Sequence, residues 1–500
     1  NKKNKRNMKK IINLIVACGA LISMASCDLD LEPTSGPTSD KVLNLEQIKG
    51  LRRNFYNDLK AISSGAYLYN TDWFADVVSE TINSGNTGAY FHLWLLYTNN
   101  SDIYSLWASY YSVMTAANYA IMKMEEAVEA DVVSRSDVQL YIGEAYFLRA
   151  YALNQLALRF CQDYDPDKAK PQLGVPLLTK YSKDPVNAPR GSLFDVYTQI
   201  QSDITEAELA VTTAGSANAI YLTADAITAF KAQVALDMHD YPNASKYASS
   251  LYASYPLVDS KIALEQMWRE DTSTETIFQP EVNTTTLSSV SSMSDYYNGL
   301  WNGSKYVTTP YYVLEQHIVD LFSTEDYRMG IYLEYSYVQL SSSQKGNGYL
   351  LTKFIGNKFF RSALTQLNYK NMPKVFRVAQ MYLIDAEAQY QQNGGGAGPL
   401  TPLRQSRGLE PTDATGKDLF DAIKDEYVRE MMGEGYRLSD LKRWKETFQR
   451  DYQSALRSVV RTRGRDMNPN VNDPKFVWPN PQDEIENNPN FGSQNPGYAQ

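Results

Sequence analysis

The strongest constraint on the fold is a series of long segments in which the same kind of side chain recurs at three- and four-residue steps. Residues 102–129 form one such segment and residues 135–161 form another. The recurring residues of the first are Trp107, Tyr111, Met114, Asn118, Ile121, Met124 and Val128. Those of the second are Tyr141, Ala145, Leu148, Ala152 and Leu156. Because this spacing is that of one face of an α-helix, we predict a helix over each segment, with Ser134 or Ser136 as N-cap of the second.

Similar periodicity predicts further helices over residues 192–212, 223–254, 374–392 and 417–446. In the second of these regions, Ala232, Ala244 and Pro256 lie 12 residues apart. That spacing fits the small, small and proline positions of a tetratricopeptide-like helix hairpin. Lys231 and Ala248 do not match the bulkier positions of that repeat, so an ordinary antiparallel helix pair is the alternative.

The middle of the chain differs from these helical segments. Residues 283–294 are rich in Ser and Thr, which predicts a loop. Residues 331–340 and 348–355 are rich in aromatic and β-branched residues and are separated by polar residues and glycine, which predicts a β-hairpin. The glycine-rich stretch 393–398 predicts another loop, and the Pro- and Asn-rich tail from Asn468 predicts little regular structure.

The N-terminal segment has the pattern of an export signal. Lys9 and Lys10 precede a short apolar stretch that ends in small residues directly before Cys27. This stretch is too short for a membrane-spanning helix, and its end resembles a bacterial lipobox. We therefore predict a lipoprotein signal peptide over residues 8–26 and a lipid anchor on Cys27, with an ordinary secretory signal as the alternative.

Charge and composition exclude several classes of protein. Loss of the six positive charges in residues 1–26 would change the net charge from -9 to -15, which disfavours a general nucleic-acid binder. Three cysteines cannot build a disulfide framework. Three scattered histidines without a paired-histidine or Cys/His motif make a His-ligated zinc site unexpected, and we expect no cofactor. Aromatic residues make up 12% of the chain, and rings beyond the needs of a core often belong to binding surfaces.

Several motifs, spread along the chain in one order, resemble those of the SusD/RagB-like family of outer-membrane nutrient-uptake lipoproteins. After the lipobox and the spaced Trp107–Asn118 motif come GEAYFLRAYA at 143–152, GVPL at 174–177 and RVAQMYLIDAEA at 377–388. They are followed by LRQSRG at 403–408, REMMGEGYRLSDLKRW at 429–444 and a Trp-Pro segment beginning at Trp478. Asn480 departs from the isoleucine that is usual in the last motif.

The resemblance implies an all-α fold of tetratricopeptide-like helix pairs, with a loop-rich ligand-binding region and a small β-hairpin. It implies one domain over residues 27–500, with a helical half at about 40–260 and a half with variable loops at about 270–500. It also implies a non-catalytic lipoprotein on the outer membrane. Such a protein captures an oligosaccharide, or in some branches an oligopeptide, and serves as the lid of a SusC-like TonB-dependent barrel.

The resemblance places the ligand site in segments near residues 70–100 and 280–310. Both segments carry aromatic and amide side chains among turn residues, a combination suited to the CH faces and hydroxyl groups of a sugar. The candidate ligand-binding residues are Trp94, Trp301, Tyr90, Tyr97, Asn99, Tyr296, Tyr297 and Asn302. Trp94 and Trp301 are the preferred stacking rings.

Two other functions stay open at this point. A secreted glycoside hydrolase would need paired carboxylates, and the 429–444 motif offers Glu430, Glu434 and Asp440. Arg437 and Arg443 lie three residues from Asp440, however, so we interpret this motif as a helical scaffold held by ion pairs. A purely structural helical-repeat adaptor is the other alternative.

Overall fold

The computed structural model describes residues 41–465 and 467–498. The predicted signal peptide (8–26) and the predicted lipid-bearing Cys27 lie outside the described residues. About half of the described part of the chain is helical, and its strands form only small sheets, so the prediction of an α-helical fold is confirmed. None of the described helices is both long and apolar enough to cross a membrane.

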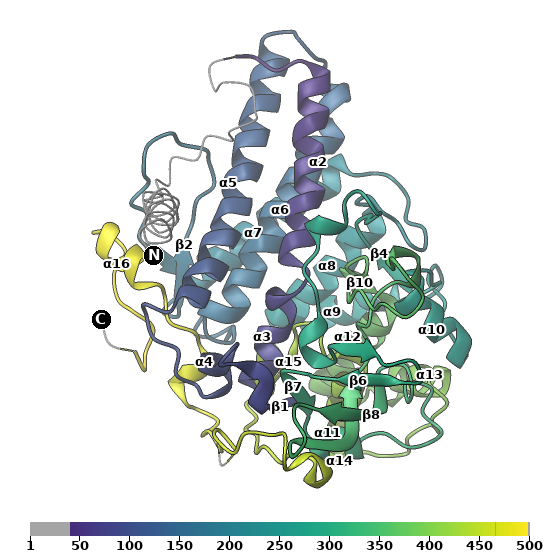
Figure 1. Cartoon of the computed structure of the whole chain (residues 1–500). Helices are drawn as coiled ribbons and strands as arrows, with labels where there is room; N and C mark the ends of the chain where they lie inside the picture. The colour runs from purple at the N-terminus through teal and green to yellow at the C-terminus, as the bar shows by residue number, and fades with distance from the viewer. Residues whose placement is uncertain (1–40, 466, 499–500) are drawn as a thin grey trace, which may run out of the picture.

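Four long helices stand together as a tall bundle in the upper part of Figure 1. They are α2 (Leu45–Ile62), α5 (Ser101–Glu129), α6 (Arg135–Phe160) and α7 (Leu193–Ala210). Helix α6 packs against the other three, which explains why it is buried along most of its length. Ser134, one of the two predicted candidates, is its N-cap: the hydroxyl accepts from the Asp137 N–H, and the Asp137 carboxylate accepts from the Ser134 N–H at 3.0 Å. The helices predicted over 102–129 and 135–161 are confirmed to within one residue.

A helix hairpin follows the bundle at the predicted place. It consists of α8 (Ala224–Asp237) and α9 (Tyr241–Ser249), joined by a turn in which His239 has a φ of 58°. Ala232 and Ala244 are fully buried, because small side chains allow close approach of the packed helices. Helix α9 also packs against α12 (Val378–Asn393), which links this hairpin to the C-terminal half.

The helix predicted over 417–446 is two helices, and this prediction is corrected. Helix α14 (Gly416–Met431) and helix α15 (Arg437–Trp444) are separated by Gly433 and Gly435, whose φ values are 80° and 87°. A positive φ ends a right-handed helix and favours glycine. A Cβ on Gly433 would come within 2.4 Å of the Phe354 ring, so glycine also allows close packing at this break.

The remaining helices are short. They are α3 (Ala66–Phe74), α4 (Ala89–His92), α10 (Lys261–Arg269), α11 (Gln316–Asp320), α13 (Ala397–Ser406) and α16 (Gln482–Asn487). Three two-stranded sheets pair β1 (Val78–Glu80) with β7 (Tyr312–Leu314), β2 (Leu173–Pro176) with β3 (Arg190–Ser192), and β4 (Thr276–Phe278) with β10 (Phe376–Arg377).

The largest sheet has four strands in the order β5-β6-β8-β9. The strands are β5 (Gly299–Trp301), β6 (Tyr306–Thr308), β8 (Leu333–Gln339) and β9 (Lys345–Leu351). Strands β8 and β9 form the predicted hairpin, although β9 begins three residues earlier than expected. Strand β6 joins the hairpin through a parallel pair between Thr308 and Val338. The Ser/Thr-rich segment 283–294 is mainly loop, as predicted.

A network of buried charges joins the C-terminal segments. Glu430 on α14 is fully buried and accepts hydrogen bonds from Arg377 (2.5 Å), Arg328 (2.9 Å) and Arg407 (3.0 Å). Burial alone would raise the pKa of Glu430, but the three guanidinium groups outweigh it and hold that pKa well below its usual range. Glu430 is therefore an ionised structural group, in agreement with the scaffold interpretation of this motif.

The other acidic groups of the motif are also engaged in ion pairs. Asp440 pairs with Arg443 at 2.9 Å, as the sequence spacing predicted. Arg437 pairs instead with Asp76 at 2.7 Å, which fixes α15 to the segment between α3 and β1. Glu434 pairs with Arg377 at 2.6 Å. The 429–444 motif thus uses its charges to join helices.

We predict that Glu430→Gln destabilises the protein by about 3–5 kcal/mol, because it leaves three buried guanidinium groups around a neutral amide. Urea unfolding followed by circular dichroism measures this change in free energy. Glu46→Gln is the matched control, because the Glu46 side chain is 77% exposed in its pair with Lys49. Equal stability of both variants would show that the network does not hold the fold.

Candidate ligand-binding surface

The tip of the β5–β6 hairpin carries Trp301, the more exposed of the two preferred stacking rings. Trp301 is 44% exposed and lies directly across the ladder from Tyr306, with the ring centroids 5.2 Å apart. The turn between them is held by Asn302, whose Oδ1 accepts from the backbone N–H groups of Ser304 (3.1 Å) and Lys305 (3.0 Å). The hairpin therefore presents one broad indole beside an exposed amide, as the sequence predicted for Trp301 and Asn302.

Neighbouring loops support this ring from behind. The Tyr306 hydroxyl donates to the Thr365 carbonyl at 3.3 Å, and Tyr297 lies edge-on to Tyr306 at 6.3 Å. The loop that contains Thr365 also carries Leu364, which is 93% exposed, and Phe359, which is 65% exposed. Trp301 thus stands on a fixed base near a loop with large apolar side chains open to solvent.

The opposite face of the same sheet carries a second row of rings that the sequence analysis missed. Tyr335 is 59% exposed and pairs across the ladder with Tyr349, with ring centroids 5.2 Å apart. The Lys305 ammonium lies 4.1 Å from the centroid of Tyr337. Leu300, next to Trp301, is 70% exposed. Tyr335 and Tyr337 are two residues apart in a segment predicted as a strand, and this alternation is the signal that could have placed both on one face.

The first predicted segment divides into two parts. Tyr90 (47% exposed) and Tyr97 (54% exposed) lie 6.4 Å apart near α4, together with exposed Asn99. Tyr90 belongs to α4 and Trp301 to β5, the strand paired with β6, and Figure 1 shows α4 and β6 on either side of α3. The stretch that does reach the second segment lies just before them: the Asn83 amide donates to the Thr309 carbonyl at 2.7 Å.

The structure corrects the expectation that Trp94 offers an open stacking face. Its side chain is only 3% exposed, and its ring stacks on Phe74 at 4.4 Å. The edges of Phe448 and Phe476 close the other sides, and the indole N–H donates to the Phe74 carbonyl at 2.7 Å. Trp94 is a core residue because aromatic groups far along the chain cover it.

Tyr296 and Tyr297 are corrected in the same way. Tyr296 is 1% exposed and packs edge-on to Tyr69 at 6.1 Å. Tyr297 is 4% exposed and packs in the small core beneath the four-stranded sheet. Their neighbours in sequence form the surface, whereas these two rings anchor the loop from inside.

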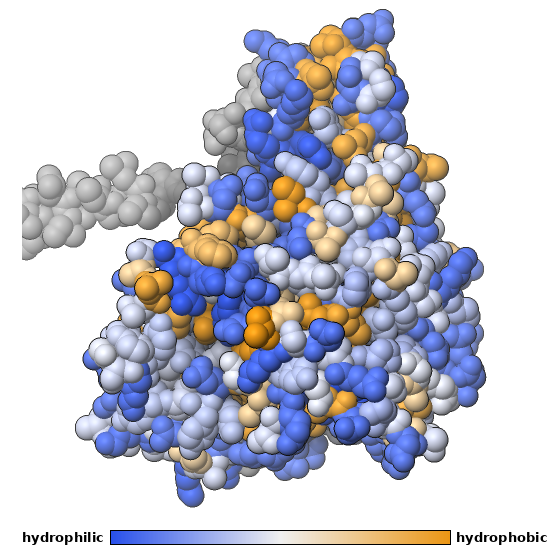
Figure 2. Space-filling model, turned by 90° about the vertical axis from the view of Figure 1, so that its right-hand side faces the viewer, coloured by the Kyte–Doolittle hydropathy of each residue, from blue (hydrophilic) through white to orange (hydrophobic). Residues whose placement is uncertain are grey.

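The face on the right of Figure 1 is mixed in character. Figure 2 shows it as hydrophilic over most of its area, with apolar side chains gathered near the middle. A surface of this kind suits a ligand that combines apolar faces with many hydrogen-bonding groups.

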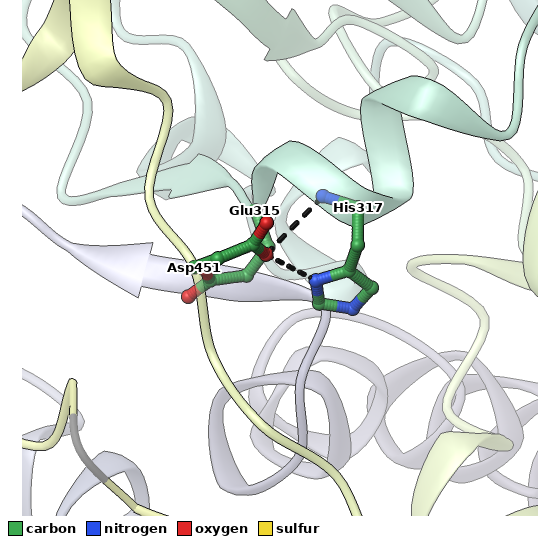
Figure 3. A group of neighbouring side chains, drawn as sticks. All are labelled: Glu315, His317 and Asp451. Carbon is green, nitrogen blue, oxygen red and sulfur yellow. Dashed lines mark hydrogen bonds and ion pairs between the residues drawn. The ribbon is translucent and has the colours of Figure 1, made fainter.

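A different group of side chains could hold a metal ion. Glu315, His317 and Asp451 each place one donor atom within 4.8 Å of the other two (Figure 3). Burial raises the pKa of Glu315 to about 7. Burial would lower the pKa of His317, but Asp76 and Asp451 outweigh it and raise that pKa to about 9. This cluster was not predicted, and a His-ligated metal site was unexpected, because Asp451 lies 134 residues from His317 in the sequence.

Comparisons with known proteins identify the family. The model of the SusD family matches residues 216–498, which is more than half of the chain. A second family model, described as starch-binding and associating with the outer membrane, matches residues 29–236. SusD-like protein P38 of Formosa agariphila is 33% identical over 175 residues, a match that spans 34% of this chain and 30% of that relative.

Solved structures show the same fold. A SusD superfamily protein from Bacteroides thetaiotaomicron superimposes with a TM-score of 0.74 at 21% identity, covering 91% of this chain and 100% of that one. A laminarin-binding SusD-like protein superimposes with a TM-score of 0.68 at 19% identity, again covering 91% and 100%. The family model covers more than half of the chain, and the helix pairs and the ion-paired scaffold agree with it. The chain belongs to the SusD family.

Proposed function

We propose that this protein is a non-catalytic lipoprotein that captures an oligosaccharide at the cell surface and delivers it to a SusC-like TonB-dependent barrel, for which it serves as the lid. The observation that carries the binding role is the Trp301 ring, half-exposed on a hairpin whose turn is fixed by Asn302. A sugar ring has an apolar CH face that stacks on an indole, and its hydroxyl groups bond to side-chain amides. The name of the laminarin-binding structural relative supports this class of ligand.

The proposed contact surface combines Trp301 and Asn302 with Leu364 of the neighbouring loop. Each stacked ring contributes on the order of 1 kcal/mol, so affinity depends on several such contacts along a chain of sugars. Tyr90, Tyr97 and Asn99 form a separate exposed group, which we propose as a further contact for the same ligand or for the barrel. Trp94, Tyr296 and Tyr297 support these surfaces from the core.

An oligopeptide is the second candidate cargo, because exposed amides such as Asn99 and Asn302 also bond to peptide backbone groups. Catalysis has less support in the geometry. The most charged motif commits Glu430, Glu434 and Asp440 to ion pairs with arginine. We therefore expect no turnover when purified protein is incubated with a panel of glycans.

We predict that Trp301→Ala lowers affinity for the bound oligosaccharide roughly fivefold, which corresponds to the loss of one ring stack of about 1 kcal/mol. A glycan and peptide array on the mature protein identifies the ligand, and titration calorimetry then measures the affinity. The melting temperature should stay close to that of the wild type, because a ring at a hairpin tip supports little core. Unchanged affinity would remove Trp301 from the site.

Trp94→Ala is the contrasting variant. Loss of this buried ring should lower the free energy of unfolding by about 3–5 kcal/mol while the folded fraction retains its affinity. Urea unfolding and calorimetry on the same preparation separate the two effects. A Trp94 variant of wild-type stability with weakened binding would contradict the core placement.

We predict that Cys27→Ala releases the protein from the outer membrane, because the acyl chains on this cysteine would be its anchor. Membrane fractionation of the native host, followed by immunoblotting, measures the distribution. Cys161→Ala is the control, since Cys161 is buried in the fold and has no access to lipid. A Cys27 variant that stays in the outer-membrane fraction would show that something else holds it there.

The lid role predicts a second protein in mild-detergent extracts of the native host. Affinity purification of the wild-type protein should yield a chain of barrel size in fixed proportion, identified by mass spectrometry. Trp301→Ala should retain this partner, because the proposed ligand contact is distinct from anchoring and assembly. An anchored protein that elutes alone would leave the lid role without support.

A further inference from the structure

Glu315, His317 and Asp451 come from two segments that lie far apart in the sequence. Glu315 directly precedes α11, His317 is in its first turn, and Asp451 lies in the extended segment that follows α15. Figure 3 shows the three side chains pointing toward one another across the junction of these segments. None of the three contributes to the proposed sugar-binding surface.

Glu315 is a buried carboxylate with one oxygen unused. Its side chain is fully buried, and Oε1 accepts a hydrogen bond from the Ser79 hydroxyl at 2.5 Å. Its Oε2 has no hydrogen-bond partner among the described residues. A buried carboxylate is stable only when its charge is compensated, so the free oxygen needs a proton or a cation.

His317 has the surroundings of a metal ligand. Its Nδ1 lies 2.5 Å from Asp451 Oδ1, on the side of the cluster. Its Nε2 faces away, 3.5 Å from Asp76 Oδ2, a contact that is charged but not a hydrogen bond in this structure. Asp76 itself is held by two bonds of 2.7 Å from Arg437. A histidine that binds metal through one ring nitrogen commonly donates from the other nitrogen to a carboxylate, which fixes the orientation of the ring.

Asp451 provides the accessible side of the cluster. Its side chain is 52% exposed. Hydrogen bonds from backbone N–H groups nevertheless hold Asp451 in place. The Gln316 N–H donates to the Asp451 carbonyl at 2.7 Å, and the His317 N–H donates to Asp451 Oδ1 at 3.2 Å. An ion could therefore reach the cluster from solvent without unfolding it.

We propose that Glu315, His317 and Asp451 bind one divalent transition-metal ion of the zinc type, with water completing the coordination. One imidazole nitrogen and two carboxylate oxygens suit zinc, whereas calcium and magnesium prefer ligand sets made of oxygen alone. The ion takes the place of the proton between His317 Nδ1 and Asp451 Oδ1, and that proton is released to solvent. Its role is structural: it fastens the segment around Asp451 to the start of α11.

The test uses the mature protein without an affinity tag, stripped with a chelator and titrated with zinc chloride at neutral pH. We expect one zinc ion per chain by calorimetry and by native mass spectrometry, and a rise in melting temperature on addition of zinc. Calcium or magnesium chloride should give no comparable rise. Absence of zinc binding, or equal binding of calcium, would overturn the proposal.

Three variants separate metal binding from a merely structural network. His317→Ala and Glu315→Gln should each weaken zinc binding by more than the roughly 10–100-fold typical of changes around a ligand. Glu315→Gln should also melt close to the wild type without zinc, because the amide oxygen can still accept the hydrogen bond from the Ser79 hydroxyl. His239→Ala is the matched control, since His239 pairs with the single carboxylate of Asp163 at 3.1 Å. Zinc binding that survives in the His317 and Glu315 variants would assign the ion to another place.

Discussion

The buried carboxylate of Glu430 is the interaction on which the C-terminal half depends. Its three arginine partners come from the loop before β8 (Arg328), from β10 (Arg377) and from the end of α13 (Arg407). These segments lie far apart in the sequence, and each arginine has a further carboxylate partner: Glu426 for Arg328, Glu434 for Arg377 and Glu275 for Arg407. Only the correct tertiary arrangement brings all these opposite charges together. Because every misplaced partner would leave a buried charge unpaired, the network favours one arrangement strongly over its alternatives.

The same network positions the hairpins that carry the exposed rings. Lys353, just after β9, donates to the Glu430 carbonyl at 2.7 Å. Arg269 of α10 donates to the carbonyl of Ile331, just before β8, and to that of Thr352, just after β9, at 2.9 Å each. Strand β6 then pairs with β8, and β5 pairs with β6. The Trp301 ring is thus connected to a rigid charged core through three successive strands, which limits its freedom before a ligand binds.

The sequence predicted the helices and strands better than the tertiary contacts between them. Helical periodicity and the β8–β9 hairpin depend on residues close in the sequence, and the structure confirms them. The 429–444 motif is confirmed as an ion-paired scaffold, but its partners are only partly local: Asp440 pairs with Arg443, whereas Arg437 pairs with Asp76 and Glu430 with arginines from other segments. The turn at Asn302 is local too, so the exposure of Trp301 was predictable. Trp94 is also followed by turn residues, but its burial depends on Phe448 and Phe476, more than 350 residues later. No local sequence pattern indicates contacts over such a distance. The cluster of Glu315, His317 and Asp451 could not be predicted for the same reason, because Asp451 lies far from the other two residues in the sequence.

The irregular segment around Asp451 joins several elements of the fold through hydrogen bonds. Arg450 donates to the carbonyls of Ala75 (2.8 Å) and His92 (2.6 Å), which joins this segment to the ends of α3 and α4. Gln453 bonds through its side chain to both the N–H and the carbonyl of Tyr349 in β9, at 2.8 Å each. Between these two residues, Asp451 contacts α11. This short segment therefore joins the region of α3 and α4, which carries Tyr90, to the sheet that carries Trp301. An ion bound at Asp451 would order the segment and so restrict the motion of these two regions relative to each other.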